Sequence, residues 1–110
     1  MKTYKFTDKW GDEMDAYLVR AIYMDGSLAV EMVANPDGYW EEYATLSVNL
    51  GMGDERHAFV DVNNCPWATK FLEDNGLARC MGVGKYSGYC MYPFYEFTEK
   101  FFAEAEAMEE

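Results

Sequence analysis

The sequence is poor in the residues that form disulfides, bind metals or contact nucleic acid. Only three cysteines occur among 110 residues, and an odd number in a small chain argues against a closed disulfide framework. Nine basic residues stand against twenty acidic ones, which disfavours binding to phosphates or to an anionic membrane. No apolar run approaches the roughly 18 residues that a membrane span needs. The first residues, MKTYKFTDKWGDEMD, lack the apolar stretch of a signal peptide, so we expect a cytoplasmic protein.

What the sequence does contain is apolar residues and negative charge. Half of its residues are apolar and 17% are aromatic, so the chain can form a hydrophobic core. Its length fits one domain over residues 1–110. The net charge of −11 would attract a basic partner.

The first half of the chain has the two-residue period of β-strands. Residues 17–24 and Leu28–Ala34 flank Asp25-Gly26, a pair typical of a two-residue type I′ hairpin turn. This turn predicts that Arg20 lies opposite Glu31 as an ion pair. It also predicts one apolar face, formed by Tyr17, Val19, Ala21, Tyr23, Leu28, Val30, Met32 and Ala34. Further strands are expected at residues 3–7, 42–50 and 58–62, with one or two more within residues 77–97.

Two helices are expected. The first covers residues 66–75, with Asn63 or Asn64 as N-cap and Gly76 as the C-terminal stop. The second covers residues 98–110, an acidic helix with Phe101 on its apolar side and a frayed end at Glu109 and Glu110. The sequence therefore predicts an α+β domain: an antiparallel sheet of about five or six strands, one packed helix and a C-terminal helix.

The thiol of Cys65 is open to three interpretations: packing, metal binding and catalysis. A position in the first turn of a helix would stabilise a thiolate, and His57 is the single histidine that could act as its base. His57, Cys65, Cys80 and Cys90 are also enough ligands for a tetrahedral zinc ion. Their spacing lacks the C-x-x-C pattern of a strong zinc signal. We expect packing, with no cofactor, and keep zinc as the alternative.

Acidic residues near the turns point to binding. Carboxylates two residues apart on one strand face lie about 6.6 Å apart, and rows of them can imitate a nucleic-acid backbone. The residues expected to bind a basic partner are Glu13, Asp15, Asp37, Glu41, Glu42, Asp54 and Glu55.

Three segments resemble a known family: YATLSVNL (residues 43–50), VDVNNCPWATKFLEDNGLA (residues 60–78) and SGYCMYPFYEF (residues 87–97). They are similar to small domains of unknown function from gut Firmicutes, their phages and their conjugative elements. That family has no established catalytic residues, so the resemblance implies no active site. It implies an accessory protein of a mobile element, a class that includes anti-restriction and anti-CRISPR proteins.

The leading hypothesis is a non-enzymatic inhibitor of a host defence system, namely an anti-CRISPR protein. Its acidic surface would occupy the DNA-binding channel of a Cas nuclease, without binding nucleic acid or membrane itself, in the bacterial cytoplasm. The alternatives are a zinc-stabilised interaction module with no defence role, and a small cysteine-dependent enzyme. The exposed aromatic residues fit either a monomer or a homodimer.

Overall fold

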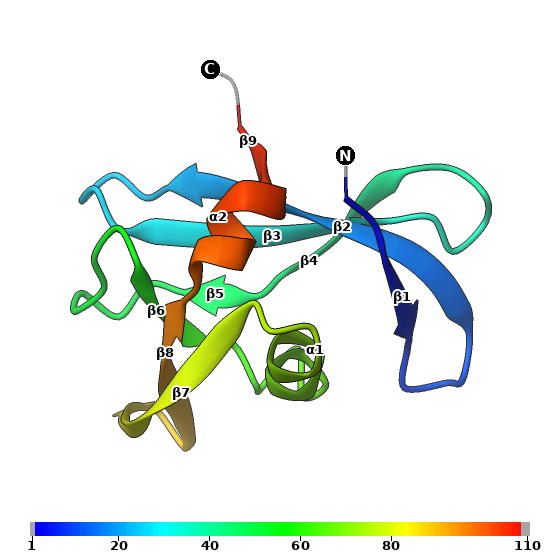
Figure 1. Ribbon diagram of the computed structural model, residues 1–110. Helices are drawn as coiled ribbons and strands as arrows, with labels where there is room; N and C mark the ends of the chain where they lie inside the picture. Colours follow the sequence, from blue (N-terminus) through cyan, green and yellow to red (C-terminus); the bar gives the residue numbers. More distant parts are fainter. Residues whose placement is uncertain (1, 109–110) are drawn as a thin grey trace.

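The computed structural model describes residues 2–108 as two mostly antiparallel sheets with two short helices, which confirms the α+β class. The larger sheet has the order β1-β2-β3-β4, with β9 also paired to β2, and the smaller has the order β5-β6-β8-β7. Figure 1 shows the two sheets with α1 below the larger one. The elements are β1 (Tyr4–Thr7), β2 (Glu13–Ile22), β3 (Leu28–Ala34), β4 (Glu41–Thr45), β5 (Ser47–Val48), β6 (His57–Val60), α1 (Ala68–Asp74), β7 (Ala78–Ser87), β8 (Cys90–Phe97), α2 (Glu99–Glu104) and β9 (Glu106–Ala107).

The β2–β3 hairpin exists, but its predicted register is wrong by one residue. The loop has three residues, Met24 to Gly26, because the Tyr23 N–H donates to the Ser27 carbonyl at 2.8 Å. Gly26 has a φ of +87°, as expected for the glycine bulge that closes a three-residue loop. A shift of one residue turns every side chain of a strand to its other face. The buried residues of β2 are therefore Met14, Ala16 and Leu18, in place of the predicted Tyr17, Val19, Ala21 and Tyr23.

The predicted ion pair between Arg20 and Glu31 is lost with that register. Arg20 lies opposite Val30, and Glu31 lies opposite Val19. The other strand was placed correctly, since Leu28, Val30, Met32 and Ala34 of β3 are all buried.

Leu46 joins the two sheets. The predicted strand at residues 42–50 is interrupted at this residue, between β4 and β5. The Leu46 N–H donates to Val30 of β3, and its carbonyl accepts from the Asp61 N–H, each at 2.8 Å. The side chain is fully buried. The N–H of Leu46 therefore bonds to the larger sheet and its carbonyl bonds to Asp61 after β6. The chain passes from the larger sheet to the smaller one at this residue.

Helix α1 closes the core with its apolar side, as predicted. Phe71 and Leu72 are buried, and Trp67 packs against Phe6 of β1 with ring centroids 4.4 Å apart. The predicted start is wrong: Asn64 donates to Asp61, and α1 begins only at Ala68, without a side-chain cap among the described residues. The stop at Gly76 is confirmed, with a φ of +68° and a Leu77 N–H that donates to the Leu72 carbonyl at 2.9 Å.

The predicted C-terminal helix is shorter than residues 98–110. Thr98 caps α2 by accepting from the Phe101 N–H, and the chain becomes extended at Ala105. β9 then pairs in parallel with Val19 and Arg20 of β2, on the edge that β1 leaves free. A helix this short has little stability of its own, so sheet pairing ends it. The predicted fraying at Glu109 and Glu110 lies outside the described residues.

Across residues 2–108, neither helix has the length and apolar character needed to cross a membrane.

Candidate functional site

Five of the seven predicted binding residues lie at one end of the larger sheet, which we call the acidic end. These are Glu13 and Asp15 at the start of β2, Asp37 in the β3–β4 turn, and Glu41 and Glu42 at the start of β4. The hydrogen-bonding register produces this cluster. Val33 of β3 pairs with Tyr17 on one side and with Glu42 on the other.

Residues 15 and 17 share one strand face, so Asp15 and Glu42 project from the same outer face of the sheet. The cluster is fixed by backbone hydrogen bonds as well as by strand pairing. Asn35, in the β3–β4 turn, accepts the Asp15 N–H with its side chain at 2.8 Å and donates its own N–H to the Asp15 carbonyl at 3.2 Å. The turn that carries Asp37 is thereby tied to β2. Lys5 of β1 forms an ion pair with Asp15 at 2.8 Å. Glu13, Asp37, Glu41 and Glu42 are exposed.

Asp54 and Glu55 are not part of the acidic end. They precede β6, and the Asp54 carbonyl accepts the N–H of Leu28, at the opposite end of β3 from Ala34. The six residue steps from Leu28 to Ala34 correspond to about 20 Å of strand. The predicted binding residues therefore form two separate groups.

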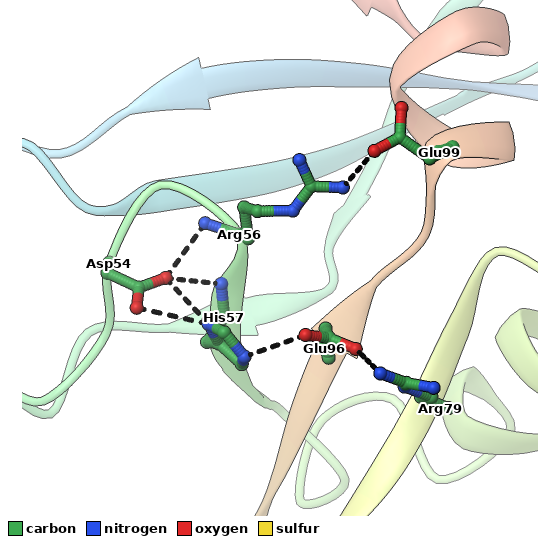
Figure 2. Close-up of polar contacts among 6 residues, drawn as sticks. All are labelled: Asp54, Arg56, His57, Arg79, Glu96 and Glu99. Carbon is green, nitrogen blue, oxygen red and sulfur yellow. Dashed lines mark hydrogen bonds and ion pairs between the residues drawn. The ribbon is translucent and has the colours of Figure 1, made fainter.

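The carboxylate of Asp54 forms hydrogen bonds with neighbouring residues of its own chain (Figure 2). It accepts the backbone N–H groups of Arg56 and His57, each at 2.8 Å, and His57 Nδ1 lies 2.8 Å from Oδ1 and 3.0 Å from Oδ2. Burial acts to raise the pKa of Asp54, but these hydrogen bonds outweigh it and hold the pKa below its usual value. Asp54 shapes the loop before β6, and Glu55 beside it is exposed.

His57 links β6 to β8, a contact that the sequence reasoning missed. Its Nε2 lies 3.2 Å from Oε2 of Glu96, which also forms an ion pair with Arg79 of β7 (Figure 2). The ring stacks on Phe94, with centroids 5.5 Å apart. Nearby, Arg56 reaches Glu99 of α2 at 2.7 Å. The spacing of these residues in the sequence does not predict the contacts, because they become neighbours only when β6, β8 and β7 pair.

Cys65 does not have the environment predicted for a reactive thiol. It lies three residues before α1 and is buried, and its Sγ donates to the Thr45 carbonyl at 3.6 Å. Burial, followed by the nearby charge of Asp61, raises the pKa of Cys65 to about 11. Both nitrogens of His57 lie next to carboxylates, so the structure does not form the alternative arrangement in which His57 acts as the base of Cys65. Packing explains this thiol.

The four alternative zinc ligands occupy separate places. Cys65 is in the core, Cys80 is exposed on β7 opposite Tyr95, and Cys90 pairs with Ser87 at the β7–β8 turn. Cys90 and Tyr95 are five residues apart on β8, or about 16 Å. Within residues 2–108, no group of three or more His, Cys, Asp or Glu side chains is arranged to hold a metal ion.

The sequence matches one family model, a domain of unknown function named DUF4313, over residues 18–107. The chain belongs to the DUF4313 family. No curated protein and no solved structure is significantly similar to it. The predicted resemblance to a family of uncharacterised small domains is thereby confirmed at that level.

The DUF4313 match runs from β2 to β9 and leaves β1 outside. Asp37, Glu41 and Glu42 of the acidic end fall within it, whereas Glu13 and Asp15 precede it. A hollow of about 670 Å³ lies between the β2–β3 hairpin and α2, and all of its lining residues except Met108 fall within the match. Arg20, Arg56, Ile22, Phe102 and Met108 are among the residues that line it.

Proposed function

We propose that this DUF4313 protein is a non-enzymatic inhibitor of a nucleic-acid-targeting defence protein, and that its acidic end binds the basic DNA channel of a Cas nuclease. The clustering of five carboxylates on β2, the β3–β4 turn and β4 supports this function. It brings five of the twenty acidic residues to one end of the larger sheet. The strands and the Asn35 hydrogen bonds hold these groups before a partner arrives, which lowers the entropy lost on binding.

The surroundings of the carboxylates also suit a protein partner. Trp10, Tyr39 and Trp40 are exposed in the two turns at this end of the molecule. Trp40 packs edge-on against Tyr17, with centroids 5.2 Å apart, so its position is defined. Aromatic side chains are enriched in protein interfaces. The proposed contact therefore combines charge with apolar area.

The test is DNA cleavage by a purified, guide-loaded type II Cas nuclease, titrated with this protein at two salt concentrations. We expect inhibition that weakens at the higher salt, because both surfaces are charged. Glu41→Lys/Glu42→Lys should raise the concentration for half-inhibition at least tenfold. The matched control is Glu55→Lys/Glu106→Lys, which also changes the net charge from −11 to −7 but leaves the acidic end intact.

Equal loss of inhibition in both variants would show that net charge acts without a defined surface. Unchanged inhibition in both would exclude the acidic end as the binding surface. Absence of inhibition by the wild-type protein at large excess would exclude this nuclease as the target.

A further inference from the structure

The turn-proximal part of the β7–β8 hairpin projects from the body of the molecule, and we call residues 81–91 the arm. β7 is the last strand of its sheet, so its outer edge is unpaired in the described structure. Residues 81–89 are all exposed. Isolated two-stranded ribbons are marginally stable in water. The arm therefore lacks the burial that stabilises the other strands.

The exposed side chains of the arm are mostly apolar or aromatic. Met81, Val83, Tyr86, Tyr89 and Met91 are each at least 42% exposed. Gly84 has no room for a side chain, because a Cβ would lie 2.7 Å from the Tyr92 carbonyl oxygen. The two strands thus approach closely, and the exposed apolar side chains gather around the end of the hairpin, with Tyr86 paired opposite Met91 on one face. A surface of this kind marks an interaction site.

The arm is also a surface of hydrogen-bond donors in an acidic protein. Residues 75–95 contain no Asp or Glu, and Lys85 gives the arm a positive charge. The Lys85 ammonium donates to the Leu50 carbonyl at 2.9 Å, a neutral acceptor that leaves its charge in place. The hydroxyls of Tyr86 and Tyr89 and the free edge of β7 add further donors.

The acidic end has the complementary chemistry. Carboxylates only accept hydrogen bonds, and the neighbouring exposed rings of Trp10, Tyr39 and Trp40 offer apolar area for the methionines of the arm. In Figure 1 the arm lies at the lower left and the acidic end at the right, on opposite sides of the molecule. The two surfaces of one chain cannot meet each other.

We propose that the arm of one copy docks on the acidic end of a second copy. The contact is heterologous, since it joins two different surfaces. It also covers the acidic end, so self-association and binding of a basic partner compete for the same carboxylates. The self-association does not depend on the proposed function and is measured without any nuclease.

The experiment is sedimentation equilibrium at 150 mM NaCl, over a protein concentration series. We expect the wild-type chain to associate reversibly. Two variants, Lys85→Glu/Tyr89→Ser in the arm and Glu41→Lys/Glu42→Lys in the acidic end, should each be monomeric. Mixed together they should form a 1:1 complex, because the intact arm of one can bind the intact acidic end of the other. Glu55→Lys/Glu106→Lys should associate like the wild type.

A wild-type chain that stays monomeric at 1 mM would overturn the proposal. So would association of the wild type without complementation in the mixture, the result expected for a contact between two arms. Near-ultraviolet circular dichroism verifies that each variant is folded, and Tyr89→Ser alone replaces the arm variant if the double substitution unfolds. Because no nuclease is present, this result is separate from success or failure of the inhibition assay.

Discussion

Cys65 provides the most direct test of a single side chain. With its pKa raised to about 11 by burial, Cys65 stays protonated at pH 8. We expect iodoacetamide at pH 8 to label the exposed Cys80 while Cys65 stays unmodified in the folded protein. In denaturant Cys65 should react at an ordinary rate, since an unfolded thiol has a pKa near 8.5. Mass spectrometry of peptides after a labelling time course measures both rates.

Labelling of Cys65 before Cys80 under native conditions would contradict this burial and reopen the interpretation as a reactive thiol. The prediction separates two effects on the pKa of Cys65 that cannot be distinguished from the sequence alone, the helix N-terminus and burial. A cysteine just before a helix has a lowered pKa only when the helix N-terminus points at the thiol. Here the thiol faces the Thr45 carbonyl and the core, so burial determines its pKa.

Individual residues of the site were predictable to different degrees. The exposed acids at turns could be predicted, because charged residues at loop ends stay in water. The two roles of Asp54 and Glu55 could not, because Asp54 gains its partners only when the loop folds around it. The same holds for Glu96, whose contact with His57 depends on which strands become neighbours.

Among the elements, the β2–β3 hairpin shows how strongly a turn determines the register of its two strands. Its loop ends at Gly26, with a φ of +87°, a conformation that costs a residue with a Cβ about 1–2 kcal/mol. We therefore expect Gly26→Ala to lower the free energy of unfolding by about 1–2 kcal/mol. Chemical denaturation measures the loss, and Met24→Ala is the control, since Met24 is exposed in the same loop.

An unchanged stability of Gly26→Ala would contradict the three-residue loop. The sequence predicted this hairpin and its position correctly, because Asp-Gly between two apolar runs is a strong local signal. It did not determine the loop length. Both registers bury the same residues of β3, and in the structure Met14, Ala16 and Leu18 of β2 pack into the core. That packing involves residues far away in the sequence.

The end of α2 was unpredictable for the same reason. The apolar spacing of Phe101, Phe102, Ala105 and Met108 is compatible with a longer helix. The free edge of β2 beyond β1 offers two strand hydrogen-bonding positions, and β9 takes them. Pairing with β2 thus outweighs the local helical pattern of residues 101–108.

At the scale of the whole molecule, the sequence predicted the class but not the division into two sheets. The strand that connects them was expected to be continuous, since its alternation runs through Leu46 without a Gly or Pro. Its break depends on Val30 and Asp61, which flank Leu46 in the fold. The division also sets the distribution of charge. It separates Asp54 and Glu55 from the acidic end and leaves the acid-free arm on the smaller sheet.

The balance of charge over the whole chain leads to a prediction about stability and salt. With twenty acids against nine bases, the excess negative charge gives a net repulsion in the folded state. Salt screens this repulsion, whose range at 0.15 M is about 8 Å. It also weakens exposed ion pairs such as Lys70–Asp74, at 2.6 Å, but each of these contributes only about 0–1 kcal/mol. The repulsion among many acids should therefore dominate.

We expect the free energy of unfolding at pH 7 to rise on the order of 1 kcal/mol between 10 and 300 mM NaCl, or about 4–8 °C in Tm for a chain of this size. Thermal unfolding followed by circular dichroism measures the shift. Glu41→Lys/Glu42→Lys, with its net charge reduced to −7, should show a smaller increase than the wild type. A Tm that falls as salt is added would mean that local ion pairs outweigh the repulsion, and that the carboxylates of the acidic end are already compensated within the fold.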